Sequence, residues 1–463
     1  MTTLVKSLGA LRGTALMLNI VIGAGLLVLP GLAVQEVGDL AIWSWIACAL
    51  AALPLVGVFL LLGRRFPDAG GVAHLARQGF GATGYAVASF LLLGAVIFGL
   101  PSIALAGSYY ASTMLGGDPH LYAALLIALG AAVHLVSSAT AARFNSLVAA
   151  SVVVALVALL AIGFVGLPAR EGEPPIRLPV LADLGSIFTP FMMIFFAFTG
   201  WEVGAGISEE FRNPRRDLPI AMFLSFSIAV LLYAAAAYLT QRIDLHGNFT
   251  APFVAMVEPT LGRLGAALVS LTAIVIVFAN LSGAIWGVSR LVFALSREGM
   301  LPRALQTARD GSPVQAVAIT AATLLAVVAL DALGILGIGR MLGMAGQNFL
   351  ILYGIAAATL VLTARALGER LLAGISLAIV LALLAPSGQS LVYPAAPLNR
   401  CSGAHRRLAG PPRGGHCRAE QLKVRAAGAV RRTEGEFHMQ GSPPDDNRLA
   451  PTDHELDRAR SSN

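Results

Sequence analysis

The sequence predicts an all-α, polytopic membrane protein. Of its 463 residues, 57% are hydrophobic and only 12% are charged, whereas about 25% of the residues of a typical soluble domain are charged. Apolar runs long enough to cross a bilayer recur along most of the chain. Two of these runs are interrupted by glycine near the middle, at "GAG" (23–25) and at "FTGWE" (198–202). Because the two breaks occur in separate apolar runs, they also point to an internal repeat within this fold class.

Eleven segments are expected to cross the membrane as helices, because each is predominantly apolar over most or all of the length that a span requires. The expected spans are roughly 14–34, 40–62, 84–115, 120–138, 145–167, 186–208, 218–240, 263–293, 313–331, 341–363 and 371–386.

The expected spans divide into two blocks of five, about 14–167 and about 186–363, followed by an extra helix at about 371–386. Because each block holds an odd number of helices, the second block must be inverted relative to the first. Both blocks begin with an interrupted helix, and such a pair is the best sequence pointer to the binding site of a secondary transporter. The sequence therefore predicts a 5+5 inverted repeat with discontinuous helices 1 and 6.

Loop charges predict the orientation. If the N-terminus is cytoplasmic, fifteen lysine and arginine residues fall inside and five fall outside, as expected from the excess of positive charge in cytoplasmic loops. No small-residue cleavage site precedes the first span, which we therefore expect to be retained. The predicted location is the inner (plasma) membrane, with many passes through the lipid bilayer. The five residues on the outer side are Arg170, Arg177, Arg242, Arg263 and Arg340.

The first break suits the carboxylate of a zwitterion. Unwinding at Gly23, Ala24 and Gly25 frees backbone N–H groups, and the next half-helix points its positive dipole end at them. Glycine accepts unusual backbone angles and lets a ligand approach the main chain. A close contact between helices is the alternative, because small residues favour it in membranes. The second break in the mirrored position favours the binding site.

The second break, from Ala197 to Glu202, is expected to free carbonyl oxygens for an ammonium group, with Thr199 as an additional polar contact. Phe198 is the first choice for a lid or wall over an apolar side chain, ahead of Trp201. Packing is the alternative for both aromatic residues. Since no other strong charge lies near the breaks, a neutral, apolar substrate is favoured.

Glu202 is an ionisable group inside an expected span. Because burying such a group costs several kcal/mol unless it is paired or protonated, its presence indicates a functional role. Two roles stay open. The carboxyl group could carry a coupled proton, or it could be structural and accept hydrogen bonds from N–H groups freed by the break.

Other polar groups give weaker signals. Asn280 and Ser282 could be ion ligands, but hydrogen bonds between helices are favoured, and His134 is expected to be packed. The three cysteines, Cys48, Cys401 and Cys417, form no cluster with metal spacing. We therefore predict no metal site and no cofactor. The net charge of +7 is explained by cytoplasmic arginines rather than by a nucleic-acid partner.

Four stretches together resemble the amino acid–polyamine–organocation transporter superfamily, in the family order and over about 1–385. They are "NIVIGAGLLVLPGLA" (19–33), "RRFPDAGGVAHLARQGFG" (64–81), "FFAFTGWEVGAGISEEFRNPRRDLPIAM" (195–222) and "SREGMLPRAL" (296–305). With "FGLPSIALAG" (98–107), the second stretch looks most like the branch that exports methionine and branched-chain amino acids.

This resemblance implies a leucine-transporter-type fold that works by alternating access. It implies substrate contacts from both breaks, and gating by the loops around 64–77 and 213–219. The implied contact residues are Ile22, Gly23, Ala24, Gly25, Leu26, Ala197, Phe198, Thr199, Gly200 and Trp201.

The C-terminal part departs from that family, which normally has twelve spans. The twelfth span is missing, and 395–463 instead holds 12 of the 32 Lys and Arg residues without an apolar period. We expect 1–394 to form the transmembrane domain and 395–463 to be a disordered basic tail, such as a change of reading frame would produce.

The sequence thus predicts a secondary transporter for neutral, apolar amino acids, which exports methionine, leucine, isoleucine and valine and is coupled to protons. An uptake permease or exchanger on the same fold is one alternative. A sensor without transport, or an inactive truncated copy, is another. An enzyme is not expected, because no nucleophile–base constellation or phosphate loop is present.

Overall fold

A computed structural model describes residues 8–23, 25–66, 71–136, 153–167, 176–307 and 313–385. The regular secondary structure of these described residues is helical. Among them, β-type pairing is limited to an isolated parallel bridge between Leu8 and Phe211. Ala24, the tail at 395–463 and the first part of the expected span 145–167 lie outside them.

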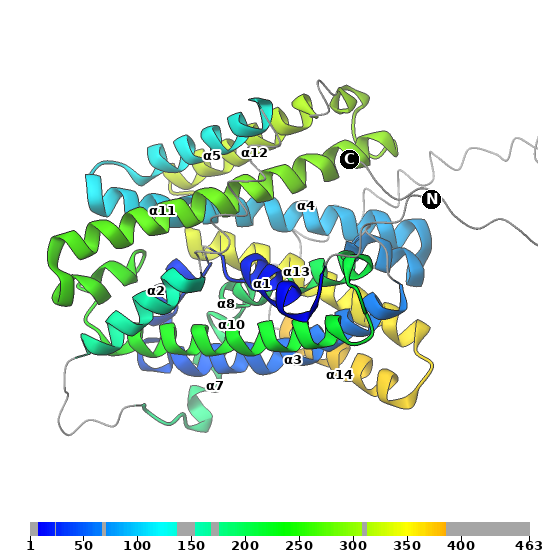
Figure 1. Cartoon of the computed structure of the whole chain (residues 1–463), viewed down its shortest axis with the longest axis horizontal. Helices are drawn as coiled ribbons and strands as arrows, with labels where there is room; N and C mark the ends of the chain where they lie inside the picture. The colour runs from blue at the N-terminus through cyan, green and yellow to red at the C-terminus, as the bar shows by residue number, and fades with distance from the viewer. Residues whose placement is uncertain are drawn as a thin grey trace, which may run out of the picture. The chain divides into compact units, whose positions relative to one another are not determined.

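Helices form where the apolar runs predict them (Figure 1). The first half contains α1 (Ala10–Val21), α2 (Gly25–Val37), η1 (Gly38–Leu40), α3 (Ala41–Arg65), α4 (Gly71–Leu115), α5 (Pro119–Val136) and a helix at Val153–Val165. The second half contains η2 (Leu181–Asp183), α7 (Leu184–Phe188), α8 (Phe191–Phe195), η3 (Phe196–Phe198), α9 (Trp201–Gly206), η4 (Ser208–Glu210), α10 (Asp217–Arg242), α11 (Pro252–Arg297), η5 (Arg303–Gln306), α12 (Val314–Ala332), α13 (Ile338–Thr363) and α14 (Leu367–Leu384).

Seven helical stretches among the described residues are long and apolar enough to cross a membrane. The count becomes eight if the bent pair Leu181–Phe188 and Phe191–Gly204 forms one span, and two shorter apolar helices lie at Pro119–His134 and Val153–Val165. A polytopic membrane protein is consistent with this composition. The expected total of eleven spans stays a prediction.

The first predicted break is present. α1 ends at Val21 because Ile22 leaves helical geometry, with φ −81° and ψ 84°, and α2 begins at Gly25. The amide of Gly23 donates to the carbonyl of Val21 at 3.0 Å, and the amide of Leu26 donates to the carbonyl of Gly23 at 3.2 Å. These short-range bonds satisfy part of the backbone that the interruption frees.

The second predicted break is also present, and it falls at Thr199 and Gly200. Thr199 is extended, with φ −97° and ψ 170°, and Gly200 has φ +107°. Only glycine adopts that angle without steric strain, so the "TG" of "FTGWE" separates η3 from α9.

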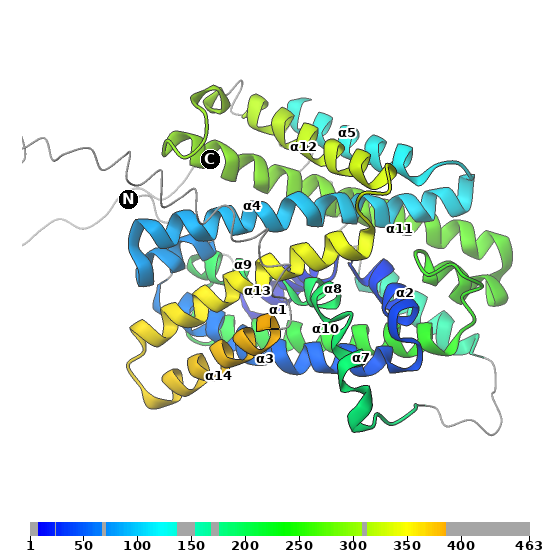
Figure 2. The same ribbon diagram turned by 180° about the vertical axis from the view of Figure 1, so that it is seen from behind.

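The two longest helices share one geometry. α4 has 45 residues and α11 has 46, and each contains one glycine with non-helical angles. Gly81 has φ 63° and ψ −150°, and Gly262 has φ 61° and ψ −160°, a region that is essentially confined to glycine. Each glycine is preceded by ten helical residues. α4 and α11 run side by side in both views (Figure 1, Figure 2).

One end of the helical bundle, here called the basic end, holds the start of α1 and the end of α3. There the guanidinium group of Arg65 binds both carboxylate oxygens of Glu369 at 2.7 Å and so joins α3 to α14. The amide of Leu8 donates to the carbonyl of Glu210 at 3.0 Å, and the amide of Arg212 donates to the carbonyl of Leu8 at 2.8 Å. The start of α1 is thereby tied to the segment that follows α9.

The opposite end is closely packed around α2. The Tyr110 hydroxyl group of α4 donates to the carbonyl of Leu27 at 2.8 Å, and α2 is buried from Gly25 to Ala33. Gly31 lies against the loop before α11 so closely that a Cβ atom there would be 2.0 Å from the carbonyl oxygen of Phe249. No side chain can be added at residue 31 without moving that loop.

The packing of α13 on α8 gives a test of the fold. A Cβ atom at Gly346 would lie 2.0 Å from the carbonyl oxygen of Met192, whereas one at Gly343, on the same helix, would meet nothing within 4 Å. We expect Gly346→Ala to destabilise the protein by about 1–3 kcal/mol through overpacking. Gly343→Ala should stabilise it by up to about 1 kcal/mol through helix propensity. Thermal unfolding of both variants in detergent checks this, and equal melting temperatures would contradict the packing.

Candidate functional site: a cavity at the two helix breaks

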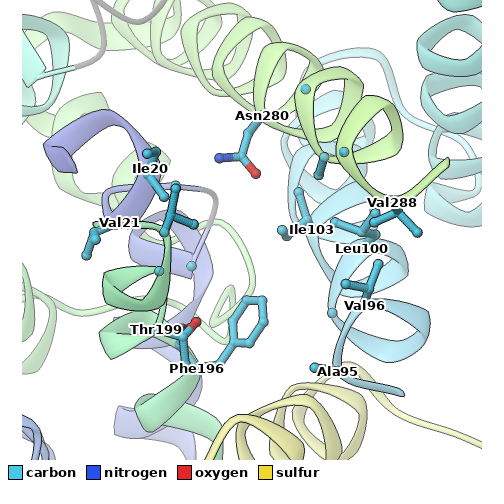
Figure 3. Close-up of a pocket in the computed structure, with 18 of the residues that line it drawn as sticks. Ile20, Val21, Ala95, Val96, Leu100, Ile103, Phe196, Thr199, Asn280 and Val288 are labelled. Atoms are coloured by element: carbon cyan, nitrogen blue, oxygen red, sulfur yellow. Dashed lines mark hydrogen bonds between the residues drawn. The ribbon is translucent and has the colours of Figure 1, made fainter. Parts of the chain in front are cut away.

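A cavity of about 660 Å³ lies between the two breaks and the long helices α4 and α11 (Figure 3). Pockets of this size accommodate small-molecule ligands. Its lining runs along α4 from Leu92 to Ile103 and along α11 from Ile276 to Leu291. On α2 the lining stops at Gly25, whereas α1 and α9 both contribute. The cavity therefore extends from the breaks toward the basic end, and the packing around α2 closes it at the other end.

The walls of the cavity are mostly apolar. The α4 side presents small and branched side chains such as Ala95, Val96 and Leu100, and the ring of Phe196 faces them across the cavity (Figure 3). The described residues that line the cavity include no lysine, arginine, histidine or aspartate. Glu202 is the single acidic residue among them. Such walls favour a ligand whose side chain is uncharged and apolar.

Tyr233 of α10 connects the two breaks. Its hydroxyl oxygen lies 3.0 Å from the carbonyl oxygen of Val21, at the end of α1, and 2.9 Å from that of Ala197, in η3. The single hydroxyl proton is therefore shared between two carbonyl groups that the interruptions leave without helical partners. Buried carbonyl groups need such partners, and one side chain supplies them to both helices.

Glu202 closes the second break from the other side. Its Oε2 atom accepts a hydrogen bond from the Tyr353 hydroxyl group at 2.6 Å and another from the Gly200 amide at 2.9 Å. The Tyr353 ring is held in an aromatic cluster with Phe59, Phe195 and Phe349. The carboxyl group lines the cavity but is only 7% exposed. Its contacts are those of a group that fixes the start of α9.

The two breaks therefore differ in what they offer to an anion. At α9, a protein carboxylate already accepts the Gly200 amide. At α2, the first turn contains no acidic residue, and Gly25 lines the cavity. The N-terminal end of a helix attracts negative charge. The start of α2 is thus the part of this cavity best suited to a ligand carboxylate.

The cavity brings together most of the residues predicted from the sequence. Those that line it are Ile22, Gly23 and Gly25 from the first break, with Ala197, Thr199, Gly200 and Glu202 from the second. The Thr199 hydroxyl group donates to the carbonyl of Phe196 at 2.7 Å, so its proton is engaged within the protein.

Three predicted contact residues do not line the cavity, and Ala24 lies outside the described residues. Leu26 is fully buried in α2. Phe198 is 1% exposed and packs against Trp45 and Tyr233, with ring centroids 6.0 and 5.2 Å apart. Trp201 packs against Phe226 at 5.5 Å. In the 3₁₀ turn, Phe196 lines the cavity and Phe198 does not, and Trp286 and Phe349 are the other aromatic residues of the lining.

Sequence reasoning did not identify the contributions of α4, α13 and Phe196 to the cavity. The α4 residues that line the cavity come from a mostly apolar stretch that gives no local signal of a ligand. The motif "FGLPSIALAG" lies in this stretch, but the sequence indicated only a family resemblance there. Tyr233 and Tyr353 were also missed, because a tyrosine in a span is more often a packing residue. His134 is packed as expected: its Nε2 atom lies 2.8 Å from the carbonyl oxygen of Ser282.

Comparison with known proteins supports an amino-acid transporter. A model of the amino acid permease family matches residues 8–387. The uncharacterized amino acid permease YecA of Bacillus subtilis is 28% identical over 400 residues, which cover 84% of this chain and 93% of that protein.

Two further relatives carry more specific names. The L-methionine/branched-chain amino acid exporter YjeH of Escherichia coli is 27% identical over 302 residues, 64% of this chain and 71% of that protein. The branched-chain amino acid permease BcaP of Lactococcus lactis is 27% identical over 322 residues, 63% of this chain and 68% of that protein. Since the family match extends over most of its length, the chain belongs to the amino acid permease family and is a transporter rather than an enzyme.

Proposed function

We propose that this protein is a secondary transporter that exports neutral, apolar amino acids, with methionine, leucine, isoleucine and valine as its substrates. The observation that carries the proposal is the cavity, which combines two helix breaks with apolar walls. Backbone dipoles at the breaks can meet the charges of a zwitterion, and the apolar walls suit its side chain. Export rather than uptake is supported by the name of the Escherichia coli relative.

We also propose alternating access between two inverted five-helix repeats, about 14–167 and about 186–363. The equivalent glycine kinks of α4 and α11, each after ten helical residues, support this repeat. A cytoplasmic N-terminus in the inner membrane, as the loop charges predict, makes the basic end cytoplasmic. The cavity then corresponds to a state that faces the cytoplasm, from which an exporter takes its substrate. A proton gradient is the expected coupling source.

Uptake by a permease or exchanger is the second candidate, and the name of the relative from Lactococcus lactis favours it. Either direction uses the same cavity, because alternating access follows the gradient to which it is coupled.

Transport measurements test the proposed function. Purified protein in proteoliposomes should exchange labelled leucine for internal leucine or methionine, and an imposed pH gradient should accelerate net flux. Lysine and aspartate should not compete. In cells, an exporter raises tolerance to toxic analogues of these amino acids, and an uptake permease lowers it. Binding without flux would indicate a sensor, and the absence of both would overturn the proposal.

Gly25→Leu tests the binding site. A Cβ atom at residue 25 already meets Leu29 at 3.3 Å and Ala197 at 3.7 Å, so a leucine side chain has to enter the cavity. Because that side chain would occupy space needed by the ligand, leucine affinity should fall by about tenfold or more. Gly374→Leu is the matched control, because residue 374 of α14 is exposed and meets nothing within 4 Å. Wild-type leucine transport by Gly25→Leu, as by the control, would exclude this binding site.

Glu202→Gln separates the two roles of the carboxyl group. The glutamine Oε1 atom can still accept from the Tyr353 hydroxyl group and the Gly200 amide, so the second break should be preserved. Because both hydrogen bonds are retained, and a weakened bond changes the free energy by only about 1 kcal/mol, we expect flux within about threefold of wild type. We also expect an unchanged pH dependence. Glu258→Gln, at an exposed carboxyl group, is the control. Loss of pH dependence in Glu202→Gln alone would instead assign proton coupling to Glu202.

A further inference from the structure

Asn280 of α11 points its amide into the cavity, toward the first break (Figure 3). The approach is close, because a Cβ atom at Gly23 would lie 2.9 Å from the Nδ2 atom of Asn280. Real Cβ atoms essentially never come so near a neighbouring atom. Glycine at residue 23 thus leaves room for the amide beside the interrupted backbone.

The Asn280 amide forms no hydrogen bond within the part of the chain that the structure describes. The other polar side chains at the breaks are engaged. The Thr199 hydroxyl group donates to the Phe196 carbonyl, and Oε2 of Glu202 accepts from Tyr353 and Gly200. In a mostly apolar cavity, an amide without a partner loses the hydrogen bonds that water gave it. A polar ligand can supply them.

A hydrogen-bonding role between helices explains the neighbouring serine but not Asn280. Ser282, two residues later on α11, meets the His134 ring of α5, with its hydroxyl oxygen 3.1 Å from Nε2. Asn348 of α13 donates to the Met344 carbonyl of its own helix at 2.8 Å. Asn280 has neither kind of partner among the described residues, and its amide lies in the cavity instead.

We propose that Asn280 is a substrate-binding residue whose NH₂ group donates to the α-carboxylate of the amino acid, beside the start of α2. This inference rests on the proposed function. Among the described lining side chains close to the breaks, the Asn280 amide is the remaining donor, because the Thr199 proton is used within the protein. A carboxylate requires donors, which the NH₂ group of Asn280 supplies.

The test compares two ligands that differ only at the carboxyl group, L-leucine and L-leucinamide, as competitors for binding of labelled leucine to the full-length protein. Wild type should prefer leucine. Asn280→Asp keeps the shape of the side chain but replaces the donor by a negative charge, so it should weaken leucine binding by about tenfold or more and reverse the preference. Thr272→Val, on the same helix and bonded only to its own helix through the Leu268 carbonyl, should leave the preference unchanged.

Asn280→Ala tests the same contact by removing the amide group without introducing a charge. It should weaken leucine binding by about tenfold and change leucinamide binding by much less. If both ligands weaken equally in both variants, the residue is structural and the proposal is overturned. Failure of the wild-type protein to bind any neutral amino acid would overturn the proposed function itself. Wild-type binding with an unaltered preference in the variants would overturn only the Asn280 contact.

Discussion

The sharing of one hydroxyl proton between two interrupted helices is the interaction on which this site depends. A break inside a helix leaves carbonyl groups without their helical donors, and a buried carbonyl group without a partner is costly. Tyr233 meets one such group at the end of α1 and one in η3. The Tyr233 hydroxyl group therefore links the two breaks directly, beside the cavity that lies between them.

Around this contact, the second break is closed by protein groups and the first is left open to a ligand. The Glu202 carboxyl group fills the start of α9, and its hydrogen bond with Tyr353 orients it. The start of α2 has no such residue. Under the proposed function, this asymmetry orients a zwitterion with its carboxylate toward α2 and its side chain toward α4 and α11. The proposed preference for a neutral substrate rests on walls whose described residues offer no lysine, arginine, histidine or aspartate.

The breaks were predictable from the sequence because glycine in an apolar run is a local signal. Gly200, with φ +107°, requires that residue type, and "GAG" lies where α1 has ended and α2 begins. The walls were not predictable in the same manner. Whether Phe196 or Phe198 faces the ligand depends on the rotation of a single 3₁₀ turn, and the contribution of α4 depends on how distant helices pack. The partners of Tyr233 and Tyr353 likewise lie far away in sequence, where no periodic pattern records them. The eleven spans and the inverted repeat stay predictions, and the matched kinks at Gly81 and Gly262 support the repeat.

The bridge between Leu8 and Phe211 has a mechanical consequence. It ties the start of α1 to the segment after α9, and Gly13 leaves room for the Phe211 ring, whose atoms would lie 2.5 Å from a Cβ atom at that position. The bridge thus fastens the start of α1 to the segment after α9, and Tyr233 fastens the end of α1 to η3, on the other side of the second break. Because α1 is held at its start by the segment after α9 and at its end by η3, the half-helix cannot be displaced from either side of the second break without losing one of these two sets of hydrogen bonds.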